Sequence, residues 1–402
     1  MEKSDTWTLN MTQMLAALSD ALDYVEGELV GASLHHAKRI SCLCAVLGEE
    51  LGMSERERFD LVSCALLHDC ALPEYIATEY DPDARIDLGA HCVSGEENMK
   101  RLPVFGDVTN VLLYHHENAD GSGPFSKRTD ETPLYARLIH MTDVMDVTLD
   151  LSGGATKAEE VRALLKEQSG KMFDPECVTL LLERENLETL LAGIGEEHLS
   201  ETMKSALPQI SRPLTATEVE DFALLFAAIV DYKSSFTARH SQGVAEKALC
   251  MAEYYGVRQP ERMQLLLAGA LHDIGKLLIS NDILEKPGRL TSEEYLEIQN
   301  HALATWQILL QIDGLEQVTC WAACHHEKLD GSGYPFGLTA NALDRNARLM
   351  ACVDIYQAMT EPRPYKSGLP HSAAMQELKR LSEKGGLDEE IVSDMDKVFG
   401  SL

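Results

Sequence analysis

Apolar residues recur along most of the chain with the period of a helix, not with the alternation of a strand. In the segments 63–70 and 265–279, apolar residues surround a histidine and an aspartate in this helical pattern. Runs of alternating β-branched residues joined by hairpin turns are absent from the sequence. Loops rich in glycine and proline, such as DGSG and KPGRL, separate the periodic segments. The pattern predicts an all-α protein.

The histidines indicate an internal duplication. Of the fourteen histidines, ten fall into two matching sets of five. The first set is His36, His68, His91, His115 and His116, and the second set is His240, His272, His301, His325 and His326. The first two pairs of partners are 204 residues apart, and the other three pairs are 210 residues apart. A repeat of this length indicates two whole domains, not a solenoid of short units.

Aspartates follow the same register. Asp69 and Asp273 come directly after the second histidine of each set, and Asp143 matches Asp354 at an offset of 211. The final shift has a visible cause, because the first copy reads DGSGPF where the second copy reads DGSGYPF. Two prolines interrupt the helical pattern within residues 206–217. We therefore predict two tandem helical bundles, residues 1–207 and residues 216–402, each with a site built on facing helices.

Charge and composition restrict the class of ligand and the compartment. The formal net charge of -30 argues against polymeric nucleic acid, whose binding rests on Lys and Arg. A small phosphate ester remains compatible if metal ions or a few basic residues supply positive charge locally. The ten cysteines form no dense disulfide framework, so we expect them to be reduced. The sequence begins without a signal-peptide pattern and has no apolar run of membrane-span length, which predicts a cytoplasmic protein with no membrane partner.

The second copy carries a set of potential metal ligands. They are His240, His272, Asp273, His301, His325, His326 and Asp354. A single buried histidine is usually a hydrogen-bonded core residue, but that does not explain why the whole set recurs. Nitrogen and carboxylate donors suit Fe, Mn, Ni or Zn, and seven donors exceed the needs of one tetrahedral ion. Two ions bridged by Asp273 would lower the pKa of a bridging water and hold a phosphoryl oxygen for in-line attack. Lys276, one helical turn further on, is placed to contact the phosphate or the leaving oxygen.

Several motifs of the second copy resemble the HD-GYP family, a branch of the HD-domain phosphohydrolases. They are HDIGK at 272–276, ILEKPGRLT at 283–291, HHEKLDGSGYP at 325–335 and RPYK at 363–366. The resemblance covers about residues 231–400 and implies two tandem HD-domain bundles. It implies a metal-dependent phosphodiesterase that uses metal-activated hydroxide to open cyclic di-GMP or 3′3′-cyclic GMP-AMP to a linear dinucleotide.

The resemblance also implies roles for individual residues. The seven donors would hold two divalent ions in the catalytic domain, with Fe or Mn expected first and Ni or Zn as alternatives. Asp273 and Lys276 are the predicted catalytic residues. The predicted substrate-binding residues are Lys276, Tyr334, Arg348 and Lys366. Trinuclear members of the family have a glutamate four residues before the first histidine, where this chain has Phe236, so we expect two ions. Gln357 stands where the family often has a second aspartate.

The first copy keeps the donor types but loses other parts of the pattern. Its candidate metal ligands are His36, His68, Asp69, His91, His115, His116 and Asp143. Leu72 stands in place of the lysine, and the loop tyrosine is missing. The segment that matches KPGRLT is shortened and carries acidic residues at 81, 83 and 87. One interpretation is a degenerate domain that holds metal for stability or regulation, and the other is a second active site of altered specificity. We favour the degenerate domain, because losing the lysine leaves less positive charge for a phosphate.

Two other functions remain as alternatives for the whole protein. One is a signalling module that binds a cyclic dinucleotide without turnover, which the intact Lys276 speaks against. The other is an HD phosphohydrolase of a different nucleotide, which the GYP loop speaks against by family analogy alone. The expected partners are a cyclic dinucleotide and, in a homodimer, a second copy of the chain. The sequence does not choose between the two dinucleotides, and it does not identify the metal.

Overall fold

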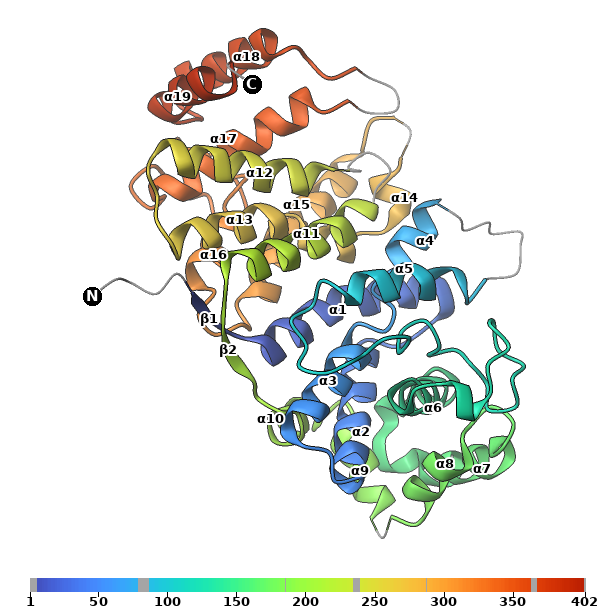
Figure 1. The fold of residues 1–402 in the computed structure, drawn as a ribbon. Helices are drawn as coiled ribbons and strands as arrows, with labels where there is room; N and C mark the ends of the chain where they lie inside the picture. Colours follow the sequence, from blue (N-terminus) through green and yellow to red (C-terminus); the bar gives the residue numbers. More distant parts are fainter. Residues whose placement is uncertain are drawn as a thin grey trace. The chain divides into compact units, whose positions relative to one another are not determined.

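The computed structural model describes residues 6–78, 87–184, 186–233, 239–286, 288–362 and 367–400. Within these residues the chain is almost entirely helical (Figure 1), which confirms the predicted all-α class. The strands β1 (Trp7–Asn10) and β2 (Ser211–Leu214) form a small two-stranded sheet. The chain divides into two compact units, an N-terminal unit of residues 10–212 and a C-terminal unit of residues 1–9 and 213–402.

The N-terminal unit is built around α2, which packs against α3 and α6. Its helices are α1 (Met11–Val30), α2 (His36–Glu50), α3 (Glu55–Leu66), α4 (Leu72–Thr78), α5 (Ala90–Met99), α6 (Leu134–Leu149), α7 (Ala158–Gln168), α8 (Pro175–Leu182), α9 (Leu187–Ile194) and α10 (Leu199–Ala206), with 3₁₀ turns η1 (Thr129–Glu131) and η2 (Leu151–Lys157). Most of α2 is buried, as expected of a helix that neighbours surround.

The C-terminal unit repeats this plan around α12, which packs against α13 and α17. Its helices are α11 (Ala216–Tyr232), α12 (His240–Tyr254), α13 (Glu261–Leu271), α14 (Asn281–Leu284), α15 (Ser292–Leu309), α16 (Glu316–Ala323), α17 (Arg345–Thr360), α18 (His371–Glu383) and α19 (Glu389–Phe399), with the 3₁₀ turn η3 (Ile274–Leu278). The helices α2 and α12 are both fifteen residues long, and each begins at the first histidine of its set.

The junction between α13 and η3 sets the position of the HDIGK motif. Residues 265–271 are all buried, because α13 packs against α11, α12 and α16. The helix α13 ends at Leu271, His272 is its C-cap residue, and η3 begins directly after Asp273. A Cβ atom at Gly275 would lie 2.1 Å from the backbone oxygen of His301, so only glycine lets η3 approach α15 this closely. The same approach brings Asp273 towards His301.

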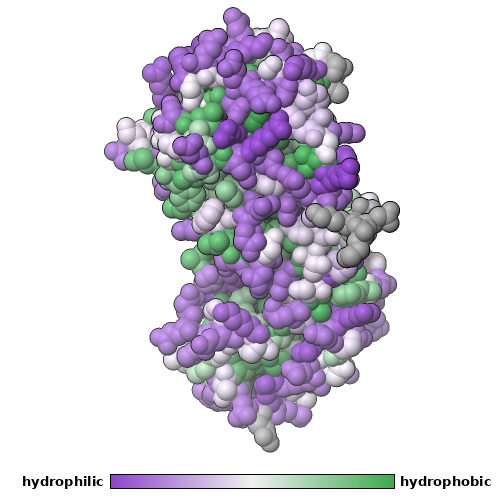
Figure 2. Space-filling view, turned by 90° about the vertical axis from the view of Figure 1, so that its left-hand side faces the viewer, coloured by the Kyte–Doolittle hydropathy of each residue, from purple (hydrophilic) through white to green (hydrophobic). Residues whose placement is uncertain are grey.

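The surface is largely hydrophilic and the cysteines are unpaired, as the amino-acid composition led us to expect. Hydrophilic residues cover most of the face shown in Figure 2. Among the helices that the structure describes, none is both long enough and apolar enough to cross a membrane. All ten cysteines are free thiols, as predicted. Burial raises the pKa of the Cys42, Cys44 and Cys352 thiols to about 12.

Candidate metal centre

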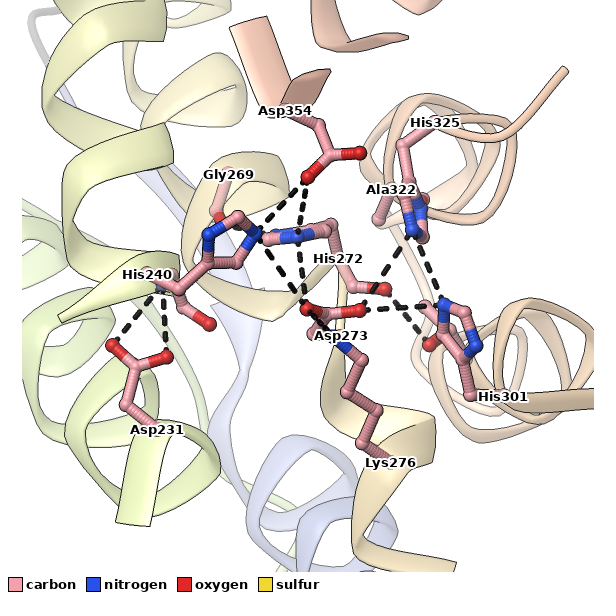
Figure 3. Close-up of polar contacts among 12 residues, drawn as sticks. Asp231, His240, Gly269, His272, Asp273, Lys276, His301, Ala322, His325 and Asp354 are labelled. Atoms are coloured by element: carbon pink, nitrogen blue, oxygen red, sulfur yellow. Dashed lines mark hydrogen bonds and ion pairs between the residues drawn. The ribbon is translucent and has the colours of Figure 1, made fainter. Parts of the chain in front are cut away.

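Five segments of the C-terminal unit bring the predicted metal ligands to one place (Figure 3). His240 begins α12, His301 lies in α15, and Asp354 lies in α17. The other four ligands stand just beyond helix ends, and they are His272, Asp273, His325 and His326. All seven side chains are buried except His326, which is partly exposed. The first and last of these residues, His240 and Asp354, are more than a hundred positions apart in the sequence, and the packing of the helices brings them together.

The donors form two groups that share one carboxylate. The ligand atoms of each group lie within 4.8 Å of one another; one group is His240, His272 and Asp273, and the other is His301, His325 and His326. Asp273 Oδ2 lies 3.2 Å from His272 Nε2 and 3.8 Å from His240 Nε2. Its other oxygen, Oδ1, lies 3.3 Å from His301 Nε2 and 3.8 Å from His325 Nε2. Asp273 therefore stands between the two groups, with one oxygen facing each.

Asp354 also faces both groups. Its Oδ1 lies 3.0 Å from His240 Nε2, and its Oδ2 lies 3.8 Å from His326 Nδ1. Burial opposes ionisation of Asp354, but the hydrogen bond with His240 and the neighbouring histidines outweigh it and hold the pKa of this carboxyl well below its usual range. The site therefore offers two ionised carboxylates, each able to contact both groups of histidines.

Backbone carbonyls fix the orientation of three imidazole rings. His272 Nδ1 lies 2.8 Å from Gly269 O, His301 Nδ1 lies 2.5 Å from Ile298 O, and His325 Nδ1 lies 2.6 Å from Ala322 O. Since a carbonyl only accepts, each Nδ1 carries the proton and each Nε2 presents its lone pair to the centre. This is the arrangement in which outer hydrogen bonds set the tautomer of metal-binding histidines.

The residues present fit a pair of cations. His272 Nε2 and Asp273 Oδ1 are buried at the centre of the site, and within the described part of the chain neither has a hydrogen-bond partner. Buried polar atoms without partners are rare in folded proteins, and a bound ion satisfies such atoms. Burial lowers the pKa of His301 to about 3 and holds the pKa of His325 well below its usual range. These imidazoles are therefore neutral at neutral pH, which is the form that binds metal.

The structure describes three of the four predicted substrate-binding residues, and their contacts differ. Lys276 Nζ lies 2.5 Å from Asp273 Oδ2, and its side chain is 21% exposed. The ring of Tyr334 lies 4.6 Å from the ring of His326, so the GYP loop borders the second group of histidines. Arg348 donates to the carbonyls of residues 340 and 343 and pairs with Asp388, so its role towards a substrate stays a prediction. Phe236 and Lys366 lie outside the described residues.

Two further residues of the C-terminal unit bear on the site. Glu361 Oε2 lies 3.2 Å from His240 Nδ1, the ring nitrogen that faces away from Asp354. The sequence analysis missed Glu361, because its contact is 121 residues away along the chain and no motif includes it. Gln357 accepts a hydrogen bond from Lys247 Nζ at 2.6 Å. It therefore takes no part in either group of donors.

The N-terminal unit gathers its seven predicted ligands in the same way. Asp69 Oδ1 lies 3.0 Å from His91 Nε2 and 3.3 Å from His115 Nε2, and Asp69 Oδ2 lies 3.6 Å from His68 Nε2. Asp143 Oδ1 lies 3.3 Å from His36 Nε2, and Asp143 Oδ2 lies 3.7 Å from the remaining histidine, at position 116. Five atoms of this site are buried without a hydrogen-bond partner among the described residues: His36 Nε2, His68 Nε2, Asp69 Oδ1, His91 Nδ1 and His115 Nε2.

The N-terminal site also contains residues that the sequence analysis did not predict. Glu26 of α1 joins a group with His36, His68 and Asp143 whose ligand atoms lie within 4.8 Å of one another. The carboxylate of Asp146 lies 2.6 Å from His36 Nδ1, in a role comparable to that of Glu361. A cavity of about 670 Å³ opens onto this site, and Leu72 is part of its wall. The position of Asp146, one helical turn after Asp143, is a sequence signal that could have identified it.

The fold and the two histidine–aspartate centres define a pair of HD domains. The sequence profile of the family described as "HD domain" matches residues 28–177 and 224–391, once in each half of the chain. The chain therefore belongs to the HD domain family, and the predicted resemblance is confirmed.

Known proteins similar to this chain carry related names. The chain is 30% identical over 400 residues to 3′3′-cGAMP-specific phosphodiesterase 1 of Vibrio cholerae serotype O1, with 96% of this chain and 91% of the relative covered. It is 34% identical over 182 residues to a cyclic di-GMP phosphodiesterase of Pseudomonas aeruginosa, with 44% of this chain and 43% of that relative covered. A crystal structure of the cyclic GMP-AMP specific phosphodiesterase V-cGAP3 of V. cholerae matches with a TM-score of 0.67 and 24% identity, over 98% of this chain and 99% of that one. This last similarity shows a shared fold.

Proposed function

We propose that the C-terminal unit hydrolyses a 3′–5′ phosphodiester bond of a cyclic dinucleotide, with two divalent cations held by its seven donors. The main support for this proposal is the position of Asp273. Its two oxygens face two groups of histidines, and Lys276 lies beside it. A carboxylate shared between two groups of donors suits a pair of ions held close together, as in many enzymes that cleave phosphate esters.

The chain's own residues then have separate tasks. Bound ions supply Lewis acidity, which polarises a phosphoryl group and lowers the pKa of a water molecule. Lys276 is the described cation nearest to Asp273, and its partly exposed Nζ is placed to pair with a phosphate oxygen. Tyr334 limits the space beside His326. Lys366 is proposed to face the phosphates as well, on the family resemblance alone. Fe or Mn are the first candidates for the ions, although the same donors suit Ni and Zn.

The names of the relatives support a cyclic dinucleotide as the substrate. The V. cholerae relative that is similar over nearly the whole chain is named for 3′3′-cGAMP, whereas the P. aeruginosa relative named for cyclic di-GMP is similar over less than half of it. Both compounds therefore belong in the test, with 3′3′-cyclic GMP-AMP as the first candidate. The predicted cytoplasmic location and the predicted homodimer are part of the same proposal.

The test is turnover by the purified full-length chain loaded with Mn²⁺ or Fe²⁺, with 3′3′-cyclic GMP-AMP and cyclic di-GMP offered side by side. We expect a linear dinucleotide from at least one of them and none from a His272→Ala/Asp273→Ala variant. The matched His68→Ala/Asp69→Ala variant assigns the reaction to a unit, because retained turnover there points to the C-terminal site and lost turnover points to the N-terminal site. No product from either substrate, with ions present, would favour a binding module or another nucleotide.

A further inference from the structure

The N-terminal site gathers more carboxylates than the C-terminal site, and therefore more negative charge when they are ionised. Three carboxylates meet there: Glu26 and Asp143 are buried, and the side chain of Asp69 is 12% exposed. Glu26 Oε1 lies 3.2 Å from His36 Nε2, and the Glu26 side chain is only 3% exposed. Across the described part of the unit, no lysine or arginine makes an ion pair with any of these three carboxylates. Only neighbouring imidazoles pair with these carboxylates, and carboxylates packed together at low exposure destabilise a fold unless cations offset their charge, so this cluster favours bound cations.

The C-terminal site is less negative. Two carboxylates face its centre, and Lys276 already neutralises part of their charge through its contact with Asp273. The undescribed segments 234–238 and 363–366 add no aspartate or glutamate, since they read SSFTA and RPYK. Among the described residues, a divalent cation at the C-terminal site therefore meets fewer carboxylates and must compete with Lys276. By Coulomb attraction alone, the N-terminal site should hold cations more tightly.

The surroundings of the N-terminal centre also favour metal binding over phosphodiester chemistry. The cavity above it is lined by the carboxylates of Glu26, Asp69, Asp87 and Asp143, and no lysine or arginine is among the described residues that line it. Leu72 occupies the position that corresponds to Lys276. Asp146, which Arg39 neutralises through two contacts of 2.8 Å, orients His36 from behind. Cys92 lies nearby, but its thiol donates to the carbonyl of Leu88, and we do not count it as a ligand.

We propose that the N-terminal unit holds two divalent cations of its own, with Glu26 as a ligand, and keeps them when the C-terminal unit has lost its ions. One group of donors is Glu26, His36, His68 and Asp143, and the other includes His91, His115 and His116, with Asp69 between them. The N-terminal unit is thus a permanently metallated domain, whereas ion supply governs the C-terminal centre. This inference does not depend on the proposed reaction, because its test needs no turnover.

The test measures ion content in two variants of the full-length chain. His272→Ala/Asp273→Ala leaves the N-terminal centre, and His68→Ala/Asp69→Ala leaves the C-terminal centre. Each is loaded with Mn²⁺ alone and dialysed against rising concentrations of a chelator, and the Mn²⁺ per chain is measured by mass spectrometry of the metal. We expect the first variant to keep ions at chelator concentrations that empty the second. Loss of all Mn²⁺ from the first variant, or release from both at the same concentration, would overturn the proposal.

The role of Glu26 is tested in the His272→Ala/Asp273→Ala background. Glu26→Gln keeps the size of the side chain and one acceptor oxygen, but it replaces the other oxygen with an amide donor and cannot ionise. We expect Mn²⁺ binding to weaken by at least about 10–100-fold, the range seen when even an outer partner of a metal site is lost. We also expect the melting temperature of the metal-free chain to stay about the same, because Asp143 and Asp146 still face His36 after the substitution. A purely structural Glu26 would give the opposite result, namely unchanged Mn²⁺ binding with a lower metal-free melting temperature.

A matched control and a fallback complete the design. Glu49 has an exposed side chain near the far end of α2, and Glu49→Gln should change neither Mn²⁺ binding nor the metal-free melting temperature. If Glu26→Gln does not fold, the chelator comparison of the two backgrounds still decides whether the N-terminal unit holds ions more tightly. Unchanged Mn²⁺ binding in a folded Glu26→Gln protein would remove Glu26 from the set of ligands.

Discussion

His240 and Glu361 are paired across the C-terminal unit: His240 Nδ1 lies 3.2 Å from Glu361 Oε2, while His240 Nε2 faces Asp354 at 3.0 Å. A carboxylate behind a metal-binding histidine fixes the tautomer and makes the opposite nitrogen a stronger donor. In the N-terminal unit, Asp146 contacts His36 in the same sense. Each copy thus supports its first histidine with a carboxylate. In the C-terminal unit this carboxylate is at the C-cap of α17, the helix that carries Asp354, whereas in the N-terminal unit it lies within α6, the helix that carries Asp143.

Removal of Glu361 should therefore weaken metal binding by the group that contains His240, without unfolding the chain. For Glu361→Ala we expect metal affinity of the C-terminal centre to fall by about 10–100-fold. Glu361→Gln should retain most of the affinity, because its amide oxygen still accepts the Nδ1 proton. Metal titration in the His68→Ala/Asp69→Ala background measures both variants. Glu253→Ala, on an exposed side chain near the other end of α12, is the control. Equal affinities for Glu361→Ala and the unaltered chain would exclude this positioning role.

Lys276 should affect turnover more than metal content. Replacing it with alanine removes the described cation that contacts Asp273, and with it the positive charge next to the proposed phosphate position. We expect turnover to fall on the order of 100-fold, the scale seen when one preorganised group is lost. Metal content should stay the same or rise, since a competing cation is gone. Lys379→Ala removes an exposed lysine that also pairs with an aspartate, and it should leave the rate unchanged. An unchanged rate for Lys276→Ala would refute its catalytic role.

Gly275→Ala should disrupt the site through the backbone. Its Cβ atom would lie 2.1 Å from His301 O and 2.8 Å from Thr305 N, and neither is the end of a flexible side chain. The substitution must push η3 away from α15, which separates Asp273 from His301. We expect a loss of at least about 1–3 kcal/mol of stability, together with loss of ions. Thermal melting and metal analysis measure the two effects.

Gly95→Ala serves as the control for this substitution. It lies within α5, where a Cβ atom would meet its nearest neighbour at an ordinary 3.5 Å. Because alanine favours helix over glycine, Gly95→Ala should be neutral or stabilise the chain by up to about 1 kcal/mol. Retained ions and unchanged melting in Gly275→Ala would show that η3 can shift without consequence for the site.

Asp231 should make the stability of the metal-free chain depend on pH. Burial raises the pKa of Asp231 to about 6, although its hydrogen bonds with Ser241 oppose this. The unfolded chain releases this proton near its usual pKa of 3.8, so the folded state binds more protons between about pH 4 and pH 6. The contribution of Asp231 to stability is therefore present below pH 4 and is lost as the pH rises to 6. The difference between the pKa of 3.8 in the unfolded chain and about 6 in the folded chain corresponds to about 3 kcal/mol.

Asp231→Asn tests this dependence. The asparagine oxygen can still accept from the backbone N–H of Ser241, but it does not ionise. We expect the variant to melt at a higher temperature than the unaltered metal-free chain at pH 7, with the difference shrinking towards pH 4. Asp221→Asn, on the exposed side of the same helix, should show no such trend. A difference that stays constant from pH 4 to pH 7 would contradict the raised pKa.

The sequence by itself determined the helical class, the duplication and the seven candidate donors that the structure brings together in each copy. It could do so because a ligand set that recurs at constant offsets leaves its mark on residue type and spacing. The missing tyrosine and Leu72 in the first copy were visible for the same reason.

Only the tertiary structure decided how the donors divide into two groups, with Asp273 between them, and which residues complete each site. Glu26 and Glu361 belong to no motif, and acidic residues are common throughout this chain. Glu361 reaches His240 because α12 packs against α17, and Glu26 reaches His36 because α1 packs against α2. Contacts between helices depend on packing, and packing is not encoded in the spacing of any short motif.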